Sequence, residues 1–159
     1  MYIIPINVNN TFLFILFIKN IFNINKMFLN AVPKVYVINL DRDKNRLTFI
    51  NKQFKQYNYT PERISAIATK DGEYKKYEKN FKQYANGNDP NAISCALSHL
   101  KAYKKIISDN VPFGLVIEDD ITVTGYITKL PDIIKSLPND WDVLWIGNCR
   151  SKWPRNECS

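Results

Sequence analysis

The sequence contains a single histidine, His99, among 159 residues. This excludes a metal centre built from several histidines and any mechanism that needs two of them. The three cysteines, Cys95, Cys149 and Cys158, are odd in number and lack the spacing of metal-ligand motifs, so they predict neither a disulfide framework nor a zinc site. We therefore expect a reducing compartment, and any bound metal to be a hard ion with oxygen ligands.

Long hydrophobic runs are also missing. The most apolar stretch, residues 12–18, is too short to span a bilayer, and it lacks the basic residues and the cleavage site of a signal peptide. We expect residues 1–30 to form a poorly ordered or apolar N-terminal extension, or a loosely attached helix, with Met27 as the natural start. The expected location is cytoplasmic or peripheral to a membrane.

The composition is that of one soluble globular domain, with 45% hydrophobic and 23% charged residues and no internal repeat. The formal charge of +7 favours an anionic partner: a nucleotide diphosphate, nucleic acid or a membrane surface. A coding bias towards Asn, Lys, Ile, Phe and Tyr is an alternative source of part of this charge.

Short apolar runs alternate with amphipathic stretches from Val35 onwards. Residues 35–40 are a near-continuous apolar run that is typical of a buried parallel strand. Asp43 is a candidate N-cap for a helix through Gln56, with Leu47, Ile50 and Phe54 on one face. Further strands are predicted at 63–67, 115–117 and 143–146, and further helices at 92–108 and 128–136. Residues 71–90 predict a loop with one exposed helix. This alternation predicts an α/β fold with a mostly parallel, Rossmann-type sheet and flanking helices.

The predicted helix at 92–108 carries His99. Its expected apolar face consists of Ile93, Ala96, Leu97, Leu100, Tyr103 and Ile107. His99 lies at the flank of this face, so we expect it to be at least partly buried. A buried histidine is more often a packing residue than a catalyst, although its ordinary pKa near neutrality leaves acid–base chemistry open.

Polar side chains follow the predicted strands, where parallel sheets bind their ligands. They are Asn39, Asp41, Arg42 and Arg46 after the first strand, Glu118, Asp119 and Asp120 after residues 115–117, and Gly147 and Asn148 after residues 143–146. Arg42 and Arg46 are candidates for phosphate binding, or ordinary surface arginines. We expect these side chains to share one rim of the sheet.

The acidic triplet is the most distinctive of these groups. If its backbone is extended, Glu118 and Asp120 share one face and Asp119 lies on the other. Two carboxylates at that spacing suit one Mg²⁺ or Mn²⁺ ion. The alternative is a solvated acidic turn.

Four segments in order resemble glycosyltransferase family 25, which includes bacterial lipopolysaccharide-sugar transferases and collagen galactosyltransferase domains. The segments are Val37-Ile38-Asn39-Leu40-Asp41-Arg42 with Arg46, then Ser94-Cys95-Ala96-Leu97-Ser98-His99-Leu100, Leu115-Val116-Ile117-Glu118-Asp119-Asp120, and Trp141-Asp142-Val143-Leu144. The resemblance implies a GT-A-like domain, a nucleotide-sugar donor such as UDP-galactose, and transfer of a hexose to a hydroxyl of a glycan or protein acceptor.

The resemblance also implies roles for individual residues. Glu118–Asp120 stands at the family's acidic motif, and Ser98-His99 at its Ser-His pair. We expect Asp120 and Glu118 to hold Mn²⁺ or Mg²⁺, and Asp120 and His99 to act in catalysis, with His99 in support. Nucleotide-sugar binding is expected of Asn39, Arg42, Arg46, Glu118 and Asp119.

The sequence departs from the family pattern in two places. Asn91-Ala92-Ile93-Ser94-Cys95 stands where the family has Gly-Glu-x-Gly-Cys, without the glutamate. The chain ends at Ser159, so we expect 34–159 to be an incomplete domain, the donor-binding half. Two alternatives stay open: a non-catalytic remnant of such an enzyme, and a metal-dependent nuclease or nucleic-acid binder that uses the lysines of residues 75–82.

Overall fold

The computed structural model describes residues 2–4, 15–19, 33–82, 88–138 and 141–146. Six strands form one sheet in the order β1-β6-β2-β5-β3-β4. The strands are β1 (Tyr2–Ile4), β2 (Ile15–Lys19), β3 (Lys34–Asn39), β4 (Glu62–Ser65), β5 (Phe113–Glu118) and β6 (Val143–Ile146). The helices are α1 (Lys44–Lys55), α2 (Glu78–Phe81), α3 (Pro90–Ser108) and α4 (Leu130–Ser136), with 3₁₀ turns η2 (Thr69–Asp71), η3 (Glu73–Lys76) and η4 (Gly125–Lys129).

The sheet confirms the α/β class. Strand β3 pairs in parallel with both β4 and β5, and β1 pairs in parallel with β6. The two groups are joined by β2, which is antiparallel to β5 and to β6. The parallel group β4-β3-β5 carries the strand ends that the sequence associates with ligand binding.

Strand β2 corrects one expectation for the N-terminal segment. Residues 15–19 are a strand inside the sheet and not part of a loosely attached helix. The facing edges of β5 and β6 would otherwise present unpaired backbone groups, and β2 pairs with both. The other residues of 1–30, including the proposed start at Met27, lie outside the described residues except for Tyr2–Ile4 in β1.

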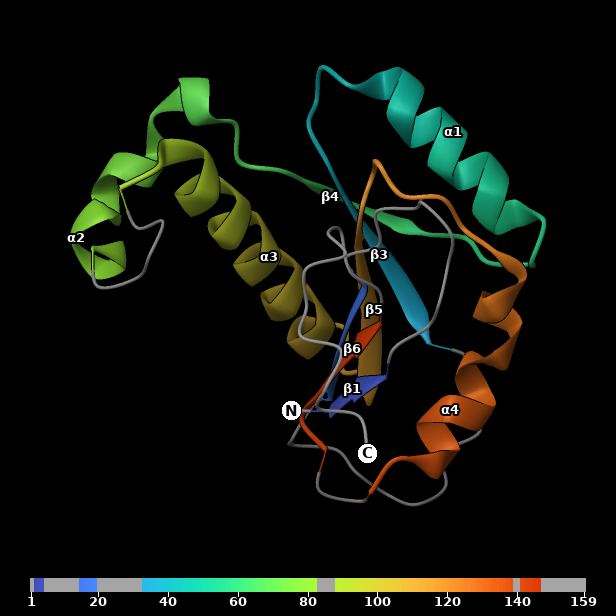
Figure 1. Ribbon diagram of the computed structural model, residues 1–159. Helices are drawn as coiled ribbons and strands as arrows, with labels where there is room; N and C mark the ends of the chain where they lie inside the picture. Colours follow the sequence, from blue (N-terminus) through green and yellow to red (C-terminus); the bar gives the residue numbers. More distant parts are fainter. Residues whose placement is uncertain (1, 5–14, 20–32, 83–87, 139–140, 147–159) are drawn as a thin grey trace, which may run out of the picture.

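Helices cover both faces of the sheet (Figure 1). One face packs against α1 and α4, where Ile50, Phe54 and Ile134 meet Leu115 and Ile117 of β5. The other face packs under α3, and its core members are Tyr36, Ile38, Ile64, Ala102, Ile106 and Val116. Because both faces of β3 and β5 are buried, their sequences are apolar without alternation.

Helix α3 buries a different face from the one its large side chains predict. Ile93 and Leu97 are buried as expected, but Leu100 and Ile107 are 44% and 54% exposed. The remaining buried positions are Ser94, Ser98, Ala102 and Ile106. Small side chains in this row let the helix lie close to the sheet, and a Cβ on Gly114 of β5 would come within 2.7 Å of the Ile106 side chain.

Helix α1 begins as expected, with Asp43 at the N-cap position, but the Asp43 side chain makes no capping hydrogen bond. Residues 69–81 form the short elements η2, η3 and α2, none of which has a buried residue. They lie at one end of α3 (Figure 1). No helix in the described part of the chain is both long and apolar enough to cross a bilayer.

Candidate functional site

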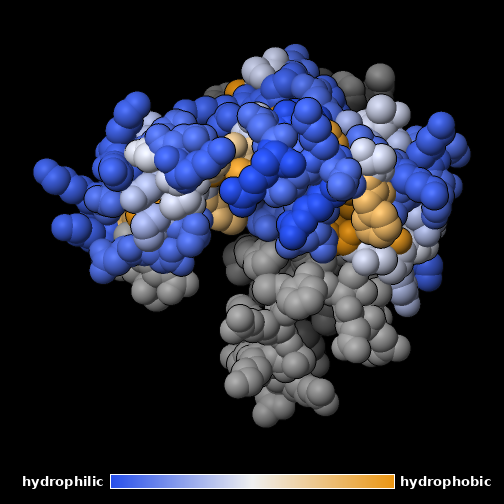
Figure 2. Space-filling view, turned by 90° about the horizontal axis from the view of Figure 1, so that it is seen from above, coloured by the Kyte–Doolittle hydropathy of each residue, from blue (hydrophilic) through white to orange (hydrophobic). Residues whose placement is uncertain are grey.

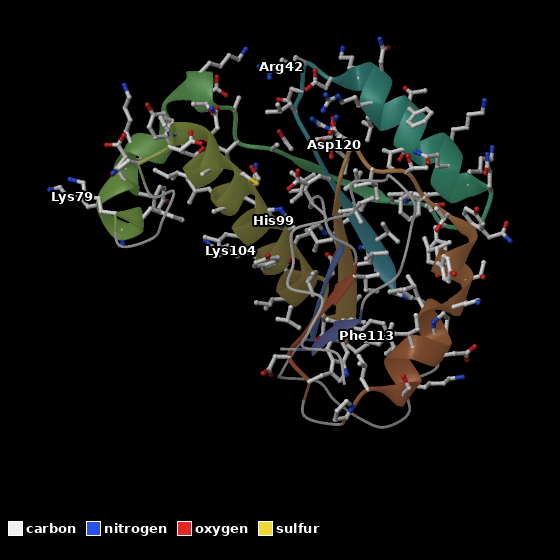
Figure 3. All side chains as sticks on the ribbon, in the orientation of Figure 1. Arg42, Lys79, His99, Lys104, Phe113 and Asp120 are labelled. Atoms are coloured by element: carbon white, nitrogen blue, oxygen red, sulfur yellow. The ribbon has the colours of Figure 1, made fainter. Side chains whose placement is uncertain are left out.

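A pocket of about 300 Å³ lies at the carboxyl ends of β3 and β5, between the loop after β4 and the first half of α3. Its charged lining residues are Arg42, Asp43, Arg46, Lys70, Glu118, Asp119 and Asp120. Figure 3 places Arg42 and Asp120 at this end of the sheet, with Phe113 at the opposite end of β5. The described surface at this end is mostly hydrophilic (Figure 2). The predicted rim therefore exists for two strands, whereas Gly147 and Asn148 lie outside the described residues.

The acidic triplet separates its three carboxylates. Strand β5 ends at Glu118, and Asp119 and Asp120 lie in a turn, so the extended backbone assumed for the triplet is wrong. Glu118 lies against α3, where the Nε2 atom of His99 is 3.1 Å from its Oε1 atom. Asp119 is 9% exposed and contacts the first strand end instead. Asp120 is exposed at the pocket.

Asn39 holds Asp119 in place. Its side-chain amide donates to Oδ2 of Asp119 at 2.5 Å and to the backbone oxygen of Asp43 at 3.0 Å. Its own Oδ1 accepts from Nε of Arg63 at 2.9 Å. Asn39 is only 2% exposed, so the structure places it beneath the pocket, in contact with Asp119.

The cations at the pocket mouth are more loosely held. Nη1 of Arg46 is 3.5 Å from Oδ1 of Asp119, and Nε of Arg42 is 3.7 Å from Oδ2 of Asp43. The side chains of Arg46 and Arg42 are 57% and 63% exposed, so both guanidinium groups keep N–H donors that an anion can reach. Lys70 of η2 is a third pocket cation that the sequence pattern did not identify.

Arg63 of β4 was also missed, and it links the first strand end to β4. It donates to Asn39 and forms an ion pair with Asp41, whose carboxylate also accepts from Ser65 Oγ at 2.9 Å. The Arg63 hydrogen bond lowers the pKa of Asp41, with help from Ser65. Asp41 thus lies in this network and outside the pocket lining.

Ser98 and His99 are neighbours on α3, but their side chains contact different segments: Ser98 contacts the loop after β4, and His99 contacts the end of β5. Ser98 is buried, accepts from the backbone N–H of Ile67 at 2.8 Å and donates to the backbone oxygen of Ser94 at 2.7 Å. It thereby ties the loop after β4 to α3. His99 has a side chain that is 15% exposed, which confirms partial burial, and its Nδ1 atom has no partner within the described structure.

The pKa values of Glu118 and Asp120 are shifted in opposite directions. The hydrogen bond from His99 lowers the pKa of Glu118 against the opposing effect of burial. Partial desolvation of its carboxyl group raises the pKa of Asp120, and the negative charges of Glu118 and Asp119 raise it further. Among the described residues, no hydrogen bond from another side chain reaches Asp120. A hard divalent cation suits these donors, because it would relieve the repulsion that acts on the Asp120 carboxylate.

The chain was compared with curated proteins and with models of protein families. No curated protein matches the sequence of this chain at a significant level. The model of glycosyltransferase family 25 (LPS biosynthesis protein) matches residues 32–157, which include every strand and helix from β3 to β6 and the whole pocket. With most of its length matched by that family model, and with the acidic triplet and Ser98 lining one pocket and His99 in contact with Glu118, the chain belongs to glycosyltransferase family 25.

Proposed function

We propose that this chain binds a nucleotide-sugar donor in the pocket at the ends of β3 and β5 and transfers its hexose, galactose-like, to a hydroxyl of a glycan or protein. The observation that carries the proposal is the charge arrangement of the pocket. An exposed carboxylate, Asp120, lies in the same pocket as Arg42, Arg46 and Lys70. A donor diphosphate needs both cations and a carboxylate-bound metal, and this pocket offers side chains for each.

The proposed roles follow from the contacts. Asp120, with Glu118, would hold Mn²⁺ or Mg²⁺, which when bound supplies electrostatic stabilisation of the departing diphosphate. Arg42 and Arg46 bind phosphate oxygens from the α1 side of the pocket, and Lys70 binds them from the other side. Asp119 anchors Arg46, and Asn39 in turn orients Asp119 beneath the pocket.

His99 acts as a positioning residue in this proposal. Its Nε2 atom is hydrogen-bonded to Glu118, and its Nδ1 atom is buried, so the imidazole presents neither nitrogen freely to the pocket. Its contribution is to fix the rotamer of Glu118 and to keep that carboxylate ionised, since its hydrogen bond lowers the pKa of Glu118. Proton transfer with the substrate is not assigned to His99.

Calorimetric titration with UDP, with and without Mn²⁺, tests donor binding. Asp120→Asn preserves the shape of the side chain but removes its charge, and we expect it to weaken Mn²⁺-dependent UDP binding by at least about tenfold. Asp132→Asn is the matched control, because Asp132 lies on α4 with a side chain that is 85% exposed and outside the pocket. Equal affinities for the wild type and Asp120→Asn would refute the assignment.

Turnover of UDP-galactose, including simple hydrolysis, separates an enzyme from a non-catalytic remnant that binds the donor without reaction. Salt-sensitive binding of single-stranded DNA in the absence of any response to UDP would instead support the nucleic-acid alternative.

A further inference from the structure

Three ligating side chains of different chemistry converge where α3 crosses the end of β5. Cys95 and His99 are four residues apart on α3 and therefore lie on one side of the helix. Glu118 reaches them from the last position of β5. One ligand atom from each residue lies within 4.8 Å of the other two.

The spacing of these atoms suits a small tetrahedral ion. Oε1 of Glu118 is 3.1 Å from Nε2 of His99 and 3.5 Å from Sγ of Cys95. An ion with bonds of about 2.0–2.3 Å to nitrogen, oxygen and sulfur holds such atoms roughly 3.3–3.7 Å apart. Glu118 therefore already lies close to this separation from both partners, and the ligand atoms of Cys95 and His99 lie within 4.8 Å of each other.

The charges of the three groups also match a divalent cation. A thiolate and a carboxylate together neutralise a charge of +2, and a neutral imidazole supplies the third ligand. The metal ligand is the deprotonated thiolate and not the thiol. Loading such a site would release one proton.

The side chains remain available to an ion. Cys95 and Glu118 line the pocket, which gives an ion and a fourth ligand from solvent a route to the cluster. The imidazole of His99 has no hydrogen-bond partner besides Glu118 in the described structure. Its ring packs beside that of Tyr103, at a centroid distance of 6.0 Å, which restricts its orientation.

We propose that Cys95, His99 and Glu118 form a binding site for one thiophilic divalent cation, Zn²⁺ above all, with a solvent molecule as the fourth ligand. Cysteine spacing along the chain predicted no zinc site, because the third ligand comes from another element, 19 residues beyond His99. This site shares Glu118 with the hard-metal site proposed at Asp120, but its other two ligands, Cys95 and His99, belong to it alone. Its existence does not rest on the proposed donor binding.

Titration with Co²⁺ reports directly on thiolate ligation. The protein for this test carries Cys149→Ser and Cys158→Ser, so that Cys95 is its only thiol. We expect a saturable near-ultraviolet charge-transfer band at one Co²⁺ per chain, displaced by Zn²⁺, with release of one proton per Zn²⁺ near neutral pH. Cys95→Ser should abolish the band, and His99→Gln should weaken Co²⁺ binding by at least about tenfold.

Asp120→Asn distinguishes this site from the donor site, because it should leave the charge-transfer band in place while weakening UDP binding. Circular dichroism checks that each variant is folded, and Cys95 is an exposed position where serine is well tolerated. The absence of a charge-transfer band in the folded parent protein, or a band that persists in Cys95→Ser, would overturn the proposal.

Discussion

Replacement of Asn39 by alanine is expected to destabilise the fold through the charge that it leaves behind. Asn39 donates to the nearly buried Asp119 and accepts from Arg63. Removing a buried hydrogen bond to a charged group costs about 1.5–3 kcal/mol, and Arg63 also loses an acceptor for its Nε–H. We expect the free energy of unfolding to fall by about 2–4 kcal/mol, measured by urea denaturation.

A double-mutant cycle with Asp119 isolates the interaction. Asp119→Ala removes the buried carboxylate, so Asn39→Ala should cost much less in that background, with a coupling energy of about 1.5–3 kcal/mol. Asn51→Ala is the matched control, because Asn51 is exposed on α1 and should change stability by less than about 0.5 kcal/mol. Additive effects of the Asn39 and Asp119 substitutions would refute the claim that Asn39 stabilises the charge of Asp119.

Two further predictions concern the rest of the fold. Gly114→Ala should lower the free energy of unfolding by about 1–3 kcal/mol, because the new Cβ would lie 2.7 Å from the Ile106 side chain. Gly125→Ala, which meets no atom within 4 Å, is its control in urea denaturation, and equal losses would contradict the close approach of α3. Burial opposes the ionisation of Asp109, but hydrogen bonds from Lys105, Lys34 and Tyr36 outweigh it and lower its pKa. The ionised Asp109 therefore adds stability above its ordinary pKa near 3.8, and this is lost as pH falls through the folded value. Asp109→Asn should reduce the melting temperature at pH 7 and reduce it less in strong acid, and a loss independent of pH would contradict this account.

The strands were largely readable from the sequence, because burial on both faces makes a strand an uninterrupted apolar run. This holds for β3 and β5. Strands β3, β5 and β6 lie within one or two residues of their predicted positions. Strand β2 was not readable, since a short apolar run fits a helix or a strand equally well until its neighbours are known. In the tertiary structure this run is a strand because it pairs with the facing edges of both β5 and β6.

The buried face of α3 shows a different limit. Hydrophobic periodicity selects the largest apolar side chains, and it favoured Leu100 and Ile107. The face of α3 that packs on the sheet instead contains small side chains, including Ser98 and Ala102. Gly114 of β5 has no side chain, and this lets α3 lie close to the strand. Periodicity measures hydrophobicity along one helix and carries no information about the shape of the partner surface.

For the candidate site, the sequence by itself determined which chemical groups are present and that most of them follow strands, since parallel strands direct their carboxyl ends to one edge. It also carried the motifs of glycosyltransferase family 25. Only the tertiary structure decided how the triplet divides, with Glu118 on His99, Asp119 on Asn39 and Asp120 facing the pocket. The tertiary structure also places Lys70 in the pocket lining and Cys95 in contact with Glu118. These pairings depend on a single turn after β5 and on the packing of α3 against it, and contacts between segments far apart in the chain are fixed only when those segments pack together.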